Sequence, residues 1–229
     1  MKLSRWIQDA GHGGTDPGAI RYGQNEKLWA LEAALFVHNR LQELGIETAM
    51  TRTEDVTLPN SERTHNVRNF DKAISHHFNA GGGNGAEFIH SIHASGEFEQ
   101  LLKEEFKQSG YPFRRIFTRR YPDRNHLDYY YMHRETGGCR VTIVEYDFLD
   151  GPNRHELQKE EYRVGMYESV VKAICREEGV SYQKKSGITA PNLLYRVIAG
   201  SFRKRQNAET RAEKLRDAGF EAYIERYKS

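Results

Sequence analysis

The stretch LSRWIQDAGHGGTDPGA, residues 3–19, joins a short, mostly apolar run to a loop rich in glycine. The run predicts a strand over residues 3–9, and residues 10–19 form the loop that follows it. Glycine has no side chain, so such a loop lets another group approach the backbone closely. His12 lies in the middle of this loop, and its single imidazole is a candidate metal ligand.

Strand and helix patterns alternate along the rest of the first 180 residues. The patterns predict strands at residues 46–52, 72–80, 86–92 and 140–148 and helices at residues 25–44, 58–70, 95–110 and after residue 150. This alternation predicts an α/β fold with a single twisted, mostly parallel sheet and helices on both faces. Residues 111–136 are rich in Arg and Tyr and lack a clear period, so we expect long surface loops there. We also expect these loops to line the groove that binds the substrate.

The C-terminal part of the chain differs from the rest in charge and pattern. Residues 182–229 contain 11 Lys and Arg against 5 Asp and Glu, although the whole chain has a net charge of only +2. Residues 181–191 have the composition of a linker between a domain at 1–180 and a small β-α-β module at 192–229. About 38 residues are too few for a stable core, so the module is expected to dock on the main domain or to pair with a second copy.

Composition narrows the class of protein. Of 229 residues, 38% are hydrophobic and 29% are charged, as in soluble globular proteins. No apolar run approaches the ~20 residues of a membrane helix, and no secretory signal is visible, so we expect synthesis in the cytoplasm and no membrane partner. Cys139 and Cys175 are too few for a disulfide framework. The basic C-terminal part could bind nucleic acid, anionic lipid or an anionic polymer such as that of the bacterial wall. The lack of a DNA- or RNA-binding motif argues against nucleic acid.

Four residues are candidates for a metal site with a catalytic carboxylate. Catalytic zinc takes three protein ligands and leaves one position for water, and a nearby carboxylate usually moves the protons. His12, His77 and Glu145 lie at or just after predicted strand ends, where α/β sheets form their sites, and Glu26 begins the first helix. Simpler explanations also exist, namely a turn or surface histidine and an acid that favours a helix N-terminus. Neighbouring strand residues face opposite sides, so His76 and His77 are not expected to bind one metal together.

The motifs around these residues resemble those of the zinc-dependent N-acetylmuramoyl-L-alanine amidases of the Amidase_3 type. The matching segments are DAGHGGTDPGA from Asp9, NEKLWALEAALFV with Glu26, TRTED from Thr51, Arg63 with Asn66, ISHHFNA from Ile74, and VEYDF with Glu145 and Phe148. The ISHHFNA motif selects His77 over His76, and over His93 in the similar segment HSIHAS. Ala10 replaces the family's usual Pro. Asp147 replaces its usual Gly and adds a carboxylate near the site.

The resemblance implies a peptidoglycan hydrolase that cleaves the amide bond between N-acetylmuramic acid and L-alanine with zinc-activated water. The residues that it assigns are the zinc ligands His12, Glu26 and His77, the catalytic Glu145, and Asn79 and Arg63 for substrate binding. A zinc peptidase that cuts stem-peptide bonds is an alternative, because the same ligand set serves that chemistry. A wall-binding protein with an inactive catalytic domain is a further alternative.

Residues 195–224 resemble one half of a SPOR peptidoglycan-binding domain. This resemblance implies bacterial peptidoglycan as a partner, and the small size of the module predicts a homodimer in which two chains contribute one half each. We expect a phage endolysin that a holin releases, with a mother-cell autolysin of a sporulating bacterium as the alternative. In both cases the protein acts on the cell wall after release.

Overall fold

The computed structural model describes residues 2–184 and 198–225, and the chain forms two units, residues 1–192 and 193–229. The larger unit is built on a six-stranded sheet with the order β4-β1-β5-β10-β6-β7. These strands are β1 (Trp6–Ala10), β4 (Thr48–Met50), β5 (Lys72–Asn79), β6 (Ala86–Ile89), β7 (Phe113–Phe117) and β10 (Arg140–Phe148). The strands β4, β1, β5 and β10 run parallel, whereas β6 is antiparallel to β10 and parallel to β7. The prediction of a mostly parallel sheet is confirmed.

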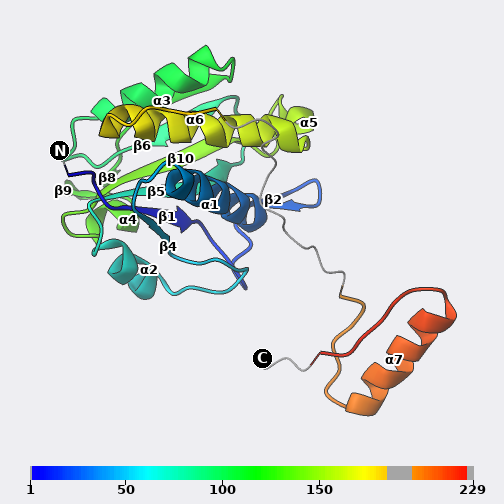
Figure 1. Cartoon of the computed structure of the whole chain (residues 1–229). Coiled ribbons are helices and arrows are strands. Elements are labelled where there is room, and N and C mark those ends of the chain that lie inside the picture. Colours follow the sequence, from blue (N-terminus) through cyan, green and yellow to red (C-terminus); the bar gives the residue numbers. More distant parts are fainter. Residues whose placement is uncertain (1, 185–197, 226–229) are drawn as a thin grey trace. The chain divides into compact units, whose positions relative to one another are not determined.

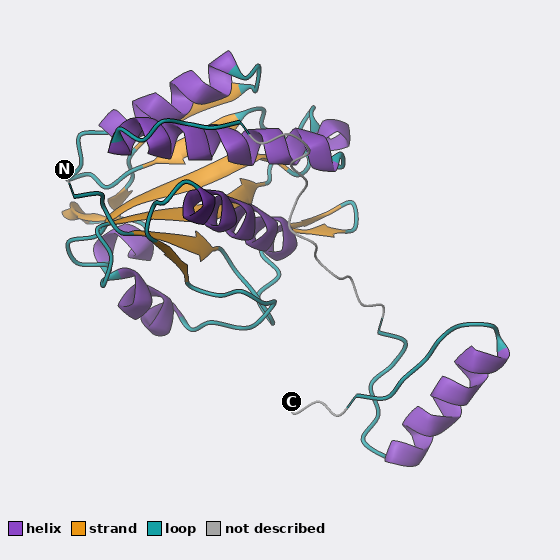
Figure 2. Cartoon of the chain, viewed as in Figure 1, coloured by secondary structure: helices purple, strands orange, loops and turns teal. Residues whose placement is uncertain are grey.

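Helices cover both faces of the sheet (Figure 1). They are α1 (Glu26–Glu43), α2 (Asn60–Val67), α3 (Glu97–Gln108), α4 (Tyr131–Arg134), α5 (Arg154–Leu157) and α6 (Glu160–Glu178). The helices α1, α3 and α6 pack on one face over the larger apolar core, and α2 and α4 pack on the other face over a smaller one. Figure 2 shows these layers as purple helices on either side of the orange strands.

The alternation of side chains along β5 explains why the site lies on the face of α2 and α4. Ile74 and Phe78 point into the larger core, and Ala73 points into the smaller one. His77 shares the face of Ala73, because residues two apart along a strand lie on the same side. The burial on this face ends before His77 and Glu145, which are only partly covered. The carboxyl ends of β5 and β10 are therefore open to a ligand.

The prediction that residues 111–136 are long loops is wrong in part. This segment forms the edge strand β7, a hairpin of β8 (Arg120–Tyr121) and β9 (Arg124–Asp128), and the short helix α4. The pairing of β7 with β6 shifts register between Ala86 and Glu87, so β7 contains a bulge. A bulge breaks the two-residue alternation that would reveal a strand in the sequence. The sequence also gives no clear signal for the two-residue strands β2 (Ile20–Arg21) and β3 (Gln24–Asn25).

The smaller unit contains α7 (Arg205–Asp217), which confirms the predicted helix, and Gly219 follows it with φ +84°. Residues 198–204 and 218–225 contain no strand, and the rest of the two predicted strands lies outside the described residues, as do residues 185–191 of the predicted linker. The predicted domain boundaries stay predictions. No helix of the described ranges is both long and apolar enough to cross a membrane.

Candidate functional site

The ends of β1, β5 and β10 bring the candidate residues to one edge of the sheet. Glu145 is the register partner of His77 on the neighbouring strand. On the other side of His77, the N–H of Gly11 donates a hydrogen bond to the carbonyl of His76 at the end of β5. A Cβ atom at Gly11 would lie 2.3 Å from Cε1 of His77. Residue 11 is therefore glycine because the imidazole ring of His77 lies directly against its backbone.

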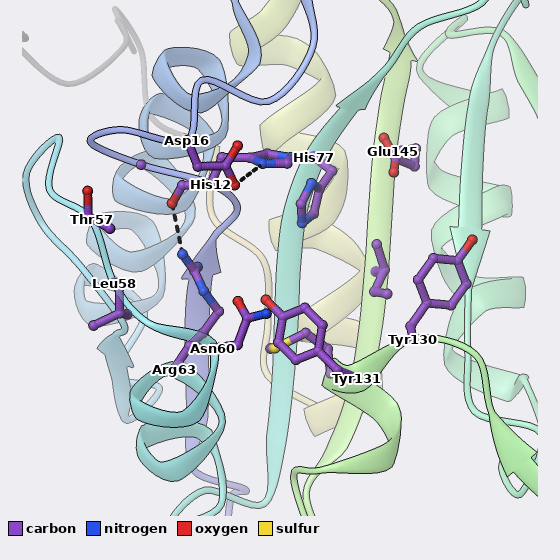
Figure 3. Close-up of a pocket in the computed structure, with 13 residues that line it drawn as sticks. His12, Asp16, Thr57, Leu58, Asn60, Arg63, His77, Tyr130, Tyr131 and Glu145 are labelled. Atoms are coloured by element: carbon purple, nitrogen blue, oxygen red, sulfur yellow. Dashed lines mark hydrogen bonds and ion pairs between the residues drawn. The ribbon is translucent and has the colours of Figure 1, made fainter. Parts of the chain in front are cut away.

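His12, Glu26 and His77 form one compact cluster. Nε2 of His12 lies 3.1 Å from Oε1 of Glu26, and Nδ1 of His77 lies 2.8 Å from the same oxygen. One ligand atom from each residue lies within 4.8 Å of the other two. Figure 3 shows the two histidines near one another, with Glu145 on the next strand. The structure thus brings together the three residues that the sequence assigned to a metal.

The backbone of His12 is held in an unusual conformation. Its φ is +58°, in the left-handed region that residues other than glycine rarely adopt. Oδ2 of Asp16 lies 2.8 Å from Nδ1 of His12, which leaves Nε2 free to face the cluster. Arg63 donates hydrogen bonds to the carbonyls of Ala10 at 2.6 Å and His12 at 2.8 Å. Backbone strain of this kind persists where surrounding contacts enforce it, and it is common at functional sites.

The buried carboxylate of Asp9 fixes Arg63 beside the start of the loop. Arg63 donates to Oδ1 of Asp9 at 2.5 Å, and the hydroxyl groups of Thr51 and Ser75 donate to the same carboxylate. Burial opposes ionisation of Asp9, but the Arg63 charge and these hydrogen bonds hold the pKa of Asp9 below its usual range. Asp9 is therefore an ionised anchor for Arg63.

Glu26 is the first residue of α1 and is 5% exposed. Its carboxylate accepts hydrogen bonds from the N–H groups of Ala19 and Phe78. Burial would raise the pKa of Glu26, but the hydrogen bonds and charges of the two histidines hold it well below its usual range. Burial would also lower the pKa of His12, whereas hydrogen bonds and charges of Glu26 and Asp16 raise it to about 9. A buried carboxylate that draws a proton onto a neighbouring imidazole is one that favours a cation.

This donor set fits a zinc ion. Two imidazole nitrogens and one carboxylate oxygen are a common ligand set of catalytic zinc. Asp16 orients His12 from behind, as second partners of metal-binding histidines do. A Cβ atom at Gly18 would lie 2.6 Å from Oε2 of Glu26 and 2.7 Å from Cδ2 of His12, so glycine keeps the space beside the cluster open. The assignment of the ligands is a prediction that these contacts support.

Glu145 has the properties of a proton acceptor. Its Oε2 atom is buried and has no hydrogen-bond partner among the described residues. Burial raises the pKa of Glu145 to about 7. A carboxyl group with this pKa exchanges protons readily at neutral pH. An unpaired oxygen beside the metal candidates is thus available for a reacting group.

A pocket of about 250 Å³ opens beside these residues. Besides His12, His77 and Glu145, its lining comprises Gly13, Asp16, Thr57, Leu58, Asn60, Arg63, Tyr130, Tyr131, Met132 and Ile143. Figure 3 shows Tyr130 and Tyr131 on the side of the pocket formed by the segment at α4. The expectation that the Arg- and Tyr-rich segment lines the site is therefore confirmed for these two residues. No local pattern in the sequence singles them out among the 13 tyrosines of the chain.

The remaining candidates lie around the cluster. His76 points to the opposite side of β5, where Nδ1 lies 2.8 Å from Tyr146 Oη and Nε2 lies 3.0 Å from Gln8 Oε1. Asn79 does not line the pocket, and its amide donates to Glu87 at 3.1 Å. The predicted substrate contacts of Asn79 and Arg63 stay predictions.

Asp147 does not line the pocket either. Its carboxylate accepts hydrogen bonds from the N–H groups of Gly85 and Phe148 and from the amide of Asn153. This carboxylate therefore ties the loop before β6 to the end of β10.

Comparisons with known proteins agree with this geometry. Residues 7–176 match the family described as N-acetylmuramoyl-L-alanine amidase, and residues 193–229 match the SPOR domain. The N-acetylmuramoyl-L-alanine amidase CwlM of Bacillus licheniformis is 26% identical, with 94% of this chain and 82% of the relative covered. The sporulation-specific N-acetylmuramoyl-L-alanine amidase of Bacillus subtilis is 24% identical over the same shares of the two chains.

Solved structures also resemble the larger unit in fold. The catalytic domain of CwlV, an N-acetylmuramoyl-L-alanine amidase from Bacillus (Paenibacillus) polymyxa, has a TM-score of 0.67 at 25% identity, covering 78% of this chain and 100% of that domain. Cwp6 from Clostridium difficile has a TM-score of 0.69 at 27% identity over 77% of this chain, which spans only 29% of Cwp6. The range matched by the family, residues 7–176, contains the four candidate site residues His12, Glu26, His77 and Glu145. The chain therefore belongs to the N-acetylmuramoyl-L-alanine amidase family and is a peptidoglycan hydrolase.

Proposed function

We propose that the chain hydrolyses the amide between N-acetylmuramic acid and L-alanine with the help of a zinc ion held by His12, Glu26 and His77. The observation that carries the proposal is the convergence of both imidazoles on one oxygen of a buried carboxylate. When bound, zinc supplies Lewis acidity toward a carbonyl group and toward water.

Glu145 performs the proton transfers in this proposal. Its unpaired Oε2 accepts a proton from the attacking water and later donates it to the nitrogen of the leaving L-alanine. The pKa of Glu145, raised to about 7 by burial, suits both steps near neutral pH. Asp16 and Arg63 hold the His12 loop in place, and Tyr130 and Tyr131 form one wall for the substrate.

Mass spectrometry of digested peptidoglycan tests the proposal. The wild-type protein is expected to release stem peptides with a free L-alanine amine, and a chelator should abolish this release. Glu145→Gln should fold and bind one zinc but be inactive, whereas Glu47→Gln at an exposed position should behave as the wild type. Near-normal turnover by Glu145→Gln would refute the role of this residue. Cuts within the stem would instead identify a peptidase.

We also propose that the smaller unit binds peptidoglycan and forms a homodimer. The match of residues 193–229 to the SPOR domain supports wall binding. Within residues 198–225, large apolar side chains are 41–79% exposed, namely Ile198, Phe202, Phe220, Tyr223 and Ile224. Large apolar side chains exposed to this degree favour burial against a partner, and a second copy offers the same side chains.

Sedimentation of the full chain tests the dimer. The wild type should sediment with twice the mass of one chain, and Phe220→Glu should sediment as a monomer. Gln206→Glu adds the same charge at an exposed polar position and should leave the dimer intact. A wild-type monomer at micromolar concentration would refute this part of the proposal.

The biological role that we propose is lysis of a bacterial wall after release of the protein from the cytoplasm. The name of the sporulation-specific relative supports a mother-cell autolysin, and the phage endolysin is the competing role. Immunoblots of a sporulating culture distinguish them, because an autolysin should accumulate late in the mother cell. A protein that appears only after phage induction would support the endolysin.

A further inference from the structure

The side chains that face the site continue beyond Glu145 toward the edge of the sheet. Glu87 on β6 is the register partner of Glu145, and Arg115 on β7 is the register partner of Glu87. His77, Glu145, Glu87 and Arg115 thus occupy successive strands of one row. Strands lie about 4.8 Å apart, so the Cα atoms of Arg115 and Glu145 are separated by roughly 10 Å.

The bulge in β7 places two arginines on one carboxylate. Ala86 pairs with Phe113 and Glu87 pairs with Arg115, so Arg114 is the extra residue. Nη1 of Arg114 lies 2.5 Å from Oε1 of Glu87, and Nε of Arg115 lies 2.9 Å from the same oxygen. Bulges commonly redirect a side chain near a functional site. Here the bulge lets two consecutive side chains reach the same partner.

The contact with Glu87 leaves both arginines with exposed N–H donors. Glu87 is 2% exposed, and its second oxygen accepts the amide of Asn79. The side chains of Arg114 and Arg115 are 45% and 51% exposed. Among the described residues, Glu87 is their one hydrogen-bond acceptor. Two cations share one carboxylate, so the group keeps one positive charge and exposed N–H donors.

An aromatic ring lies close to each of the two guanidinium groups. Arg114 lies 5.2 Å from the ring centroid of Phe148, and Arg115 lies 4.2 Å from that of Phe117. A cation–π contact holds a guanidinium near a ring, and the forked N–H groups that remain exposed suit the two oxygens of a carboxylate. The pair is therefore a preorganised site for an anion at a fixed distance from Glu145.

We propose that Arg114 and Arg115 bind a free carboxylate of the stem peptide on the leaving side of the scissile amide. This inference rests on the proposed amidase function. A chain advances at most about 3.6 Å per residue, and an arginine side chain reaches back toward Glu145, so the second residue of the stem lies in range. That residue continues the stem through its side-chain carboxyl. Its α-carboxyl is therefore left as a carboxylate or, in amidated walls, a carboxamide. The site selects the carboxylate.

Two peptidoglycan preparations test this selection. They come from one strain grown with and without the enzyme that amidates the α-carboxyl of the second residue. Initial rates over a range of substrate concentration give apparent kcat and KM for each. The wild type is expected to show about two- to fivefold higher kcat/KM on the carboxylate form, mainly through KM, as for a half-exposed ion pair.

Variants separate binding of the carboxylate from a structural role. Arg115→Gln and Arg114→Gln should each reduce the preference toward one, because the rate on the carboxylate form falls selectively. Arg115→Lys should recover part of the preference, and Arg124→Gln on the exposed hairpin should keep all of it. Equal loss on both substrates would indicate that the arginines only support the fold and would overturn the proposal.

The wild-type result separates this inference from the function on which it rests. Equal kcat/KM on the two preparations would overturn the carboxylate site and leave the amidase assignment intact. Release of stem peptides from neither preparation would overturn the proposed function itself.

Discussion

Substitution of Gly11 by alanine should disable the site without unfolding the protein. The new Cβ atom would lie 2.3 Å from Cε1 of His77, whereas ordinary contacts begin near 3.4 Å. The ring must therefore move by about 1.1 Å, away from Gly11 and out of the position in which Nδ1 of His77 lies 2.8 Å from Glu26. A misplacement of ~1 Å at a reacting centre can lower the rate about 100-fold. We expect a loss of activity of at least this size and a weaker affinity for zinc.

The assay combines the rate of stem-peptide release, the zinc content per chain and the melting temperature. Gly138→Ala is the matched control, because no atom lies within 4 Å of its new Cβ and its backbone is not left-handed. This control should keep normal activity and zinc content. Wild-type activity in Gly11→Ala would refute the argument that the glycine makes room for His77.

Three further predictions concern groups around the site and in the core. Burial lowers the pKa of His76 from 6.5 to about 3, so only the unfolded chain takes up its proton as the pH falls below 6.5. The free energy of unfolding should then fall by roughly 1.4 kcal/mol per pH unit from this group, and urea unfolding of His76→Gln should lack that part of the slope. Asp16→Asn should weaken zinc binding about 10- to 100-fold in a chelator competition, because Asp16 orients His12; an unchanged affinity would contradict this role. Arg163 and Glu32 form a buried ion pair at 2.7 Å, so Arg163→Met should cost about 3–5 kcal/mol of unfolding free energy. Combining it with Glu32→Leu should recover much of that loss, and additive losses would count against the pair.

Residues with a strong local pattern could be predicted from the sequence. The apolar runs of β1, β5 and β10 predict buried strands, and His12, His77 and Glu145 lie at or next to their ends, which the structure places at one edge. Alternation along β5 predicts that His76 and His77 face opposite sides, and His76 indeed contacts Tyr146. The position of Glu26 at the start of a helix is weak evidence by itself, and the family resemblance assigns it to the metal. Its contact with both histidines depends on tertiary packing.

The remaining features depend on contacts between distant segments. The bulge at Arg114 interrupts the alternation of β7, so the strand and its pairing with Glu87 have no local signal. Tyr130 and Tyr131 reach the pocket because α4 packs against the sheet, which a local pattern does not reveal. The sequence marks Asn79 as part of a motif, but only the structure shows that its amide binds Glu87.

The left-handed backbone at His12 has a consequence for how this protein can be improved. A residue other than glycine in that conformation lowers the free energy of unfolding by on the order of 1 kcal/mol, so glycine would make the folded chain more stable at position 12. A screen for thermal stability alone would favour His12→Gly. The resulting variant would melt at a higher temperature but would lack one of the proposed zinc ligands. Position 12 is thus a point where stability and activity are in direct conflict, and engineering for robustness should leave it fixed.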